Sequence, residues 1–79
     1  MPDARLNLRG LKCPLPALKT RKALKNLAPG DLLTVECTDP LAAIDIPALL
    51  QETGDRLEAH EKTADALLFT IRKSEAGRL

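Results

Sequence analysis

The pattern of hydrophobic and polar side chains along the chain predicts six elements of secondary structure. Apolar side chains at helical spacing predict two helices, at about residues 14–27 and 41–53. Alternation, in which every second side chain is apolar, predicts four strands, at about residues 4–8, 31–38, 56–62 and 66–73. The order of the elements along the chain is β-α-β-α-β-β.

The first helix is predicted to begin directly after a cysteine. Proline is favoured in the first helical turn, and the residue before it is pushed out of the helical region, so Cys13 is expected to be the N-cap and Pro14 the first helical residue. The run Ala28-Pro29-Gly30 ends the helix near Leu27. At 100° per residue, one face of this helix collects the side chains expected in the core, which are Ala17, Thr20, Ala23, Leu24 and Leu27.

The other side of this helix is basic. It carries Lys19, Arg21, Lys22 and Lys25, and Leu15 and Leu18 lie among them. The net charge is +1, but basic residues are in excess in the first thirty positions and acidic residues are in excess afterwards. This distribution favours an acidic partner or an anionic substrate near the first half of the chain. A solvated helix face with ordinary surface leucines is the alternative.

The second helix and the hairpin have clear boundary signals. Asp39-Pro40 starts the helix, Pro47 predicts a kink or a break within it, and Gly54 ends it. The short link at residues 63–65 joins the last two strands into a hairpin. The core-facing strand positions are expected to be Leu6, Leu8, Leu33, Val35, Cys37, Leu57, Ala59, Leu67, Phe69 and Ile71. His60 falls on the polar face.

These elements predict an α+β two-layer sandwich, in which two helices cover one face of a four-stranded mixed sheet. A β-α-β crossover makes the first two strands parallel, so they end at the same edge of the sheet. Cys13 and Cys37 are expected to be neighbours at that edge, where open α/β sheets place their sites. We expect a single domain over residues 1–79, with a core at about 5–74 and a frayed C-terminal tail from residue 74.

Composition excludes several classes of function. The 79 residues include one Phe and no Trp or Tyr, which disfavours base-stacking recognition of nucleic acid. No apolar stretch approaches the roughly 20 residues that span a bilayer, and no signal peptide is recognisable. We therefore expect a cytoplasmic protein without a membrane or a nucleic acid as direct partner. A single His and the lack of a Cys-x-x-Cys pattern predict no metal site.

The position of Cys13 suggests a reactive thiol. A helix start has a partial positive charge, and nearby Lys or Arg side chains further lower the pKa of a thiol. Lys12, together with Lys19 or Arg9, is expected to provide these charges. The sequence therefore predicts an exposed, ionised thiol at position 13.

The two prolines refine this picture. Pro14 and Pro16 cannot donate hydrogen bonds, so the candidate backbone donors to the thiol are chiefly Leu15 and Ala17. The prolines instead hold the turn rigid, which pre-organises Cys13 as a nucleophile.

The residues around Cys13 limit the reactions that its thiol is expected to perform. A redox dithiol enzyme needs a resolving cysteine close in sequence, and a protease-like site needs an activating histidine, but His60 is expected on a polar face. The remaining possibility is a thiol that accepts an atom and passes it on. A persulfide on Cys13 would extend the side chain by one S–S bond of about 2.05 Å and would require neither a pocket nor a base.

A longer run of motifs resembles a known family. The motifs are LNLRGLKCPLP at residues 6–16, Pro29-Gly30-Asp31, Thr38-Asp39-Pro40, Asp45-Ile46-Pro47 and Gly54. In this order they resemble the TusA (SirA-like) sulfur-carrier family over about residues 6–74. The resemblance implies the same sandwich, which is also seen in the C-terminal domain of a bacterial translation initiation factor.

The resemblance also implies a role for Cys13. In this family the matching cysteine carries a persulfide received from a cysteine desulfurase or a rhodanese-type sulfurtransferase. It passes the sulfur to relay proteins for tRNA thiolation, to molybdenum-cofactor assembly or to sulfur-oxidation machinery. This implies a persulfide relay rather than a stand-alone enzyme, with no cofactor beyond the transient persulfide. Gly10, Pro14 and Pro16 are the supporting motif residues.

Two positions depart from the family pattern. Asn7 stands where Asp is usual, and Cys37 stands where a small residue such as Ala is common. We interpret Cys37 as a core residue. The alternative is that Cys37 reaches Cys13 and forms a disulfide with it or resolves its persulfide.

We expect a monomer that docks partners through one surface, made of Leu15, Leu18, Lys12, Lys19, Lys22 and Lys25. Two other functions stay open. An RNA-binding module would use the basic first helix, and its binding would be salt-dependent and would survive loss of Cys13. A regulatory interaction protein would use the leucines and lysines, and its thiol would be idle.

Overall fold

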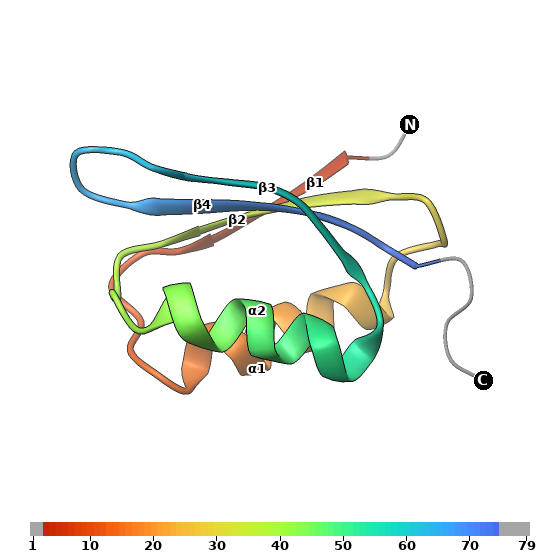
Figure 1. Ribbon diagram of the computed structural model, residues 1–79, viewed down its shortest axis with the longest axis horizontal. Helices are drawn as coiled ribbons and strands as arrows, with labels where there is room; N and C mark the ends of the chain where they lie inside the picture. Colours follow the sequence, from red (N-terminus) through yellow and green to blue (C-terminus); the bar gives the residue numbers. More distant parts are fainter. Residues whose placement is uncertain (1–2, 75–79) are drawn as a thin grey trace.

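The computed structural model describes residues 3–74 and contains the six predicted elements in the predicted order (Figure 1). The strands are β1 (Asp3–Leu8), β2 (Leu32–Cys37), β3 (Arg56–Lys62) and β4 (Leu67–Arg72), and the helices are α1 (Leu15–Lys25) and α2 (Ala42–Thr53). Apart from Ser74, the predicted frayed tail lies outside the described residues.

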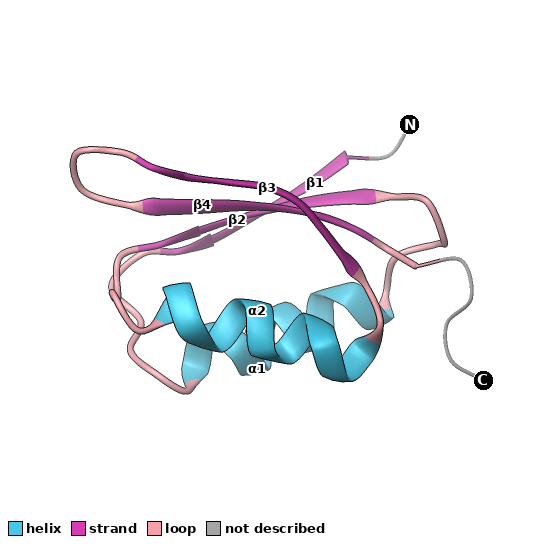
Figure 2. Ribbon diagram, viewed as in Figure 1, coloured by secondary structure: helices cyan, strands magenta, loops and turns pink. Residues whose placement is uncertain are grey.

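The four strands form one mixed sheet in the order β1-β2-β4-β3. β1 and β2 are parallel, as the crossover rule predicts, whereas β4 is antiparallel to both of its neighbours. Both helices pack against the same face of the sheet (Figure 2). The predicted α+β two-layer sandwich is therefore confirmed.

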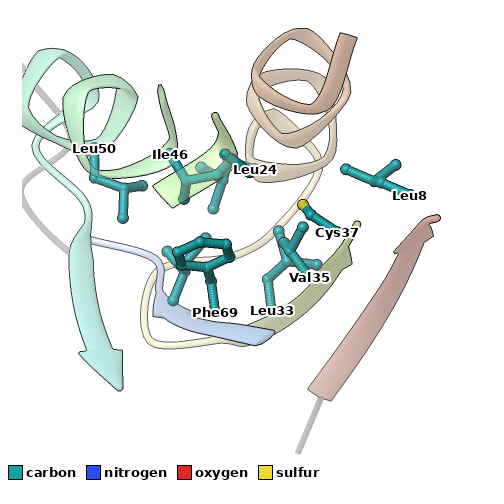
Figure 3. Packing of buried hydrophobic residues seen from close by; sticks show 10 residues of the cluster. Leu8, Leu24, Leu33, Val35, Cys37, Ile46, Leu50 and Phe69 are labelled. Carbon is teal, nitrogen blue, oxygen red and sulfur yellow. The ribbon is translucent and has the colours of Figure 1, made fainter. Parts of the chain in front are cut away.

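The core lies between this sheet and the helices. The central strand β2 contributes Leu33, Val35 and Cys37, which are at most 1% exposed. Figure 3 shows these side chains and Phe69 of β4 pointing toward the helices, which contribute residues such as Leu24 of α1. The alternation of side chains along β2 and β4 thus places the predicted residues in the core.

The strand β3 departs from the predicted alternation because it contains a β-bulge. Leu57 pairs with Ile71, but beyond the bulge His60 rather than Ala59 shares the face of Phe69. The extra residue reverses which side chains face the helices. Ala59, which was predicted to face the core, is therefore exposed.

The bulge also changes the environment of the single histidine. The predicted placement of His60 on the polar face is wrong, because its ring stacks on Phe69 with centroids 6.3 Å apart. The His60 side chain nevertheless remains exposed, because β3 is the outermost strand on its side of the sheet. A bulge is set by pairing with the neighbouring strand, so the alternation within β3 did not reveal it.

The first helix starts later and ends earlier than predicted. Its N-cap is Pro14 rather than Cys13, and its last residue is Lys25 rather than Leu27. The N–H of Leu15 donates to the carbonyl oxygen of Lys12 at 2.9 Å, so residues 12–15 form a tight turn ahead of the helix. The peptide bond between Cys13 and Pro14 in this turn, which we call the cysteine turn, is cis.

The second helix runs unbroken through Pro47, so the predicted break is absent. The proline removes one helical hydrogen bond. Burial of Ile46 and Leu50 on the sheet compensates for that loss, since both side chains are at most 4% exposed. The helix ends at Gly54, whose φ of 82° is the left-handed conformation that glycine adopts most readily.

Candidate functional site

The loops that follow the parallel strands β1 and β2 meet at one edge of the sheet. Gly10 has a φ of 81°, and its N–H donates to Oγ1 of Thr38 at 2.8 Å. The N–H of Cys13 donates to Oδ2 of Asp39 at 2.7 Å, and the N–H of Leu41 donates to Oδ1 of the same carboxylate at 3.0 Å. Asp39 therefore ties the cysteine turn to the start of α2.

The thiol of Cys13 is exposed, as predicted, but its charge environment is the reverse of the prediction. A side-chain hydrogen bond with Asp45 of α2, then desolvation, and then the negative charges of Asp45 and Asp39 raise the pKa of Cys13 above its ordinary value. Backbone hydrogen bonds from Leu41 and Cys13 lower the pKa of Asp39, so that carboxylate is ionised at neutral pH. The predicted lowering of the Cys13 pKa is therefore wrong.

The backbone explains part of this difference. Cys13 is not the N-cap, and the N–H of Leu15, one of the two predicted donors, is already bonded to the carbonyl oxygen of Lys12. Since Pro14 and Pro16 have no N–H, the first helical turn offers a thiolate far fewer donors than an ordinary helix start.

The predicted contribution of Arg9 is also absent. Its guanidinium forms ion pairs with Glu36 of β2 and with Asp65 of the β3–β4 hairpin, the latter at 3.2 Å. These bonds join the ends of three strands and raise the pKa of Arg9. Arg9 therefore supports the fold at this edge instead of acting on the thiol.

Cys13 lies in a shallow groove of about 240 Å³ between α1 and α2. Apolar side chains from both helices, among them Leu18 and Leu49, line the groove. Two helical turns further along, the groove is bordered by an ion pair in which Nη2 of Arg21 lies 2.6 Å from Oε1 of Glu52. The groove is open to solvent, so a second protein can reach the thiol.

The residues predicted to dock partners are exposed on α1 and in the loop before it. Leu15 and Leu18 are 43% and 54% exposed. The four lysines of this surface are exposed as well, and these are Lys12, Lys19, Lys22 and Lys25. Their exposure fits a docking surface, and their role in docking stays a prediction.

Two further exposed apolar residues lie at the start of α2 and were missed by the sequence analysis. Leu41 is 51% exposed and Ile44 is 67% exposed. Together with Leu15 and Leu18 they are the exposed large hydrophobic residues of the described chain. At 100° per residue, Leu41 and Ile44 fall opposite the core face of α2, so plotting that helix would have revealed them.

The second cysteine does not join the site. Cys37 is 0% exposed, and its sulfur points toward the helices (Figure 3). Both thiols are free, and the core interpretation of Cys37 is confirmed. Cys13 lies in the loop after β1, and Cys37 is the last residue of β2, so both lie at the same end of the parallel strands. Cys13 is exposed, whereas Cys37 is buried in the core. A bridge between them would require the core to open.

Burial of Cys37 predicts a loss of stability at alkaline pH. Desolvation raises its pKa from 9.0 to about 11. Because the folded-state pKa is the higher one, this contribution to stability is fully present below about pH 9 and is lost as the pH rises toward 11. We expect a loss of about 2 kcal/mol by about pH 10.5.

Urea unfolding at pH 8 and pH 10.5 measures this loss, with Cys37→Ala as the control because it lacks the titrating thiol. The variant is expected to be less stable at pH 8 but to lose about 2 kcal/mol less than the wild type between the two pH values. Equal losses in the two proteins would contradict the prediction.

Comparison with known proteins identifies the family. The model of the family described as Sulfurtransferase TusA matches residues 4–73. This chain belongs to the TusA family. The family that the motifs around Cys13 predicted is thereby confirmed.

Individual TusA proteins match almost the whole chain. Sulfur carrier protein TusA of Pseudomonas putida strain F1 is 40% identical over 72 residues, which cover 91% of this chain and 90% of the relative. The protein of the same name from Allochromatium vinosum is 36% identical over 72 residues, with 91% and 95% covered. That of Pseudomonas aeruginosa strain UCBPP-PA14 is 39% identical over 71 residues, with 90% of each chain covered.

Membership of the TusA family makes this chain a sulfur carrier that works with sulfur-relay partners in general. None of the helices within residues 3–74 has the length and hydrophobicity that crossing a bilayer requires. Over the same residues, no three His, Cys, Asp or Glu side chains come together in a group suited to a metal ion.

Proposed function

We propose that Cys13 is the residue on which this TusA protein carries sulfur. Cys13 takes a sulfur atom from the persulfide of a cysteine desulfurase or a rhodanese-type donor, holds it as a persulfide, and passes it to an acceptor protein. The observation that supports this assignment is that Cys13 is exposed in an open groove, whereas Cys37 is completely buried. The transient persulfide on Cys13 serves in place of a cofactor.

The shape of the site suits a transfer between proteins. The groove is shallow, and a persulfide places its terminal sulfur about 2.05 Å beyond the thiol sulfur, closer to an approaching partner. The acceptors that we propose are relay proteins for tRNA thiolation, molybdenum-cofactor assembly or sulfur oxidation. The cytoplasm, where thiols stay reduced, is the proposed compartment.

Sulfur uptake can be tested directly by intact-mass spectrometry. After incubation with a cysteine desulfurase and cysteine, the protein should gain about 32 Da, the mass of one sulfur atom, and a reductant should remove it. Failure of the wild-type protein to gain this mass from desulfurase and rhodanese-type donors would reject the proposed function. A regulatory protein with an idle thiol would then be the better interpretation.

The docking surface gives a second test of the same function. Leu18→Glu places a charge among the apolar side chains that border the thiol, and we expect it to slow sulfur loading by a protein donor about tenfold. Ala59→Glu is the matched control, because it adds the same charge at an exposed position of β3 on the sheet layer, and it should load normally.

Ionic strength tests the contribution of the lysines. Lys19, Lys22 and Lys25 are expected to steer an acidic partner, so raising the salt concentration should slow loading of the wild-type protein. Loading rates that depend on neither salt nor Leu18 would contradict docking through this surface.

A further inference from the structure

The loop after β1 is fastened to the loop after β2 by two hydrogen bonds. Because β1 and β2 are parallel and in register, the loops that follow them begin side by side. The N–H of Gly10 donates to Oγ1 of Thr38, and the N–H of Cys13 donates to Oδ2 of Asp39 at 2.7 Å. The second bond acts directly on the residue that carries the exposed thiol.

The cysteine turn has few other hydrogen bonds that could hold it in place. Both prolines of the motif lack an N–H, and the N–H of Leu15 is used inside the turn itself. Within the part of the chain that the structure describes, the bond from Cys13 to Asp39 is the one backbone hydrogen bond that joins residues 12–15 to anything beyond the turn and α1. The position of the Cys13 backbone therefore depends on this carboxylate.

The carboxylate of Asp39 is itself held by the start of the second helix. Its other oxygen, Oδ1, accepts the N–H of Leu41 at 3.0 Å, directly before α2. The hydrogen bonds from Leu41 and Cys13, and then the charge of Lys12, lower the pKa of Asp39, so the carboxylate is ionised at neutral pH. A hydrogen bond to an ionised acceptor is stronger than one between neutral groups. Asp39 therefore connects the cysteine turn firmly to α2.

We propose that Asp39 is a positioning residue for sulfur transfer. Its carboxylate holds the backbone of Cys13, and thereby the thiol, at one place in the groove, where the persulfide of a partner protein can meet it in the orientation that transfer requires. The part of this inference that concerns transfer rests on the proposed function. The part that concerns the position of the Cys13 backbone does not.

The transfer step shows why position matters. The thiol of Cys13 loses its proton to solvent, and the thiolate attacks the terminal sulfur of the donor persulfide. A new S–S bond forms while the S–S bond of the donor breaks, and the electron pair of the broken bond stays on the donor cysteine, which takes up a proton. Such a step is fastest when the reacting atoms are held about 3–3.5 Å apart and aligned. A docked protein cannot adjust to a moving thiol as a small reagent can.

The hydrogen bond can be tested by NMR on the wild-type protein, without a sulfur donor. As the pH is lowered, the amide proton shifts of Cys13 and Leu41 should change together, because protonation of Asp39 weakens both bonds. Their common midpoint should lie below the usual pKa of an aspartate. The other charged groups near the cysteine turn are Lys12, Arg21, Asp45 and Glu52. Separate midpoints for the two amides, or no change at Cys13, would overturn the proposal.

Replacement of Asp39 tests its effect on transfer. In Asp39→Ser the hydroxyl can accept the N–H of Leu41 in a local turn, whereas the bond to Cys13 is lost. With a saturating cysteine desulfurase, we expect loading about tenfold slower than in the wild type, at an unchanged half-saturating concentration of the donor. Inorganic polysulfide is small and approaches the thiol from any direction, so it should load the variant at least as fast as the wild type.

Two further variants control this comparison. Asp31→Ser is the matched control, because Asp31 also accepts a backbone N–H, from Ala28 at 2.9 Å, but precedes β2 at the other end of that strand. It should load like the wild type from both donors. Asp39→Asn keeps an oxygen that can accept the N–H of Cys13, so it should load at least threefold faster than Asp39→Ser from the desulfurase.

Circular dichroism and urea unfolding establish that the compared variants are folded. A wild-type rate of desulfurase loading in Asp39→Ser, an equal loss with both donors, or Asp39→Asn as slow as Asp39→Ser would overturn the proposal. The NMR titration needs no variant, so it can refute the proposal even if Asp39→Ser does not fold. If neither donor loads the wild-type protein, the proposed function fails, while the titration still decides whether Asp39 holds the backbone of Cys13.

Discussion

A Cys13→Ser variant is expected to take up no sulfur from a desulfurase under conditions in which the wild-type protein gains about 32 Da. The serine hydroxyl is nearly the same size as the thiol, but it does not form the nucleophile that attacks a persulfide at neutral pH. The only other thiol, on Cys37, is 0% exposed and cannot replace Cys13 without opening the core. The effect should therefore be complete.

Intact mass over time measures this effect, and peptide mapping locates the adduct. Cys37→Ala is the matched control, because it also removes one thiol, and it should load at the wild-type rate while it remains folded. An adduct on Cys13→Ser equal to that of the wild type would contradict the assignment of Cys13. A loss of loading in Cys37→Ala, with the fold intact, would point to a second thiol in the relay.

Replacement of Phe69 by alanine should have the largest effect on stability. Phe69 is 1% exposed, and it contacts side chains of the core from the middle of β4. Loss of a buried Phe side chain generally lowers the free energy of unfolding by about 3–5 kcal/mol. The total stability of small domains is about 5–15 kcal/mol, so this variant is expected to be close to unfolding at room temperature.

Urea unfolding followed by circular dichroism measures this change. Leu68→Ala is the control, because Leu68 is the neighbour of Phe69 in β4 but points away from the helices and is only half-buried. It should lower the free energy of unfolding much less, by about 1 kcal/mol. Similar losses in the two variants would contradict the assignment of faces on β4.

The fold was predictable because most of its signals are local. Alternation along β2 and β4 placed Val35 and Phe69 in the core, and the structure confirms both. The same rule failed at β3, where the bulge after Leu57 turned Ala59 outward and brought His60 beside Phe69. The bulge depends on pairing with β4, which no pattern within β3 contains.

The site was predictable only in part. The motif around Cys13 correctly indicated an exposed thiol beside Leu15 and Leu18. Asp45 was noticed as part of a family motif, but its place in the groove with Cys13 was not foreseen. Asp45 lies there because α2 packs beside α1, whereas a helix-start rule considers only the residues next in sequence.

The order of the elements and the core faces of β2 and β4 could be read from the sequence alone, whereas the family was indicated by the run of motifs around Cys13. The elements and their core faces follow from the spacing of apolar side chains and from prolines and glycines, whose effects extend over a few residues. The charged groups around Cys13, in contrast, follow from the packing of the helices and loops. The free energy of ionising a thiol depends on nearby charges, and folding brings Asp39 to the backbone of Cys13 and places Asp45 in the same groove.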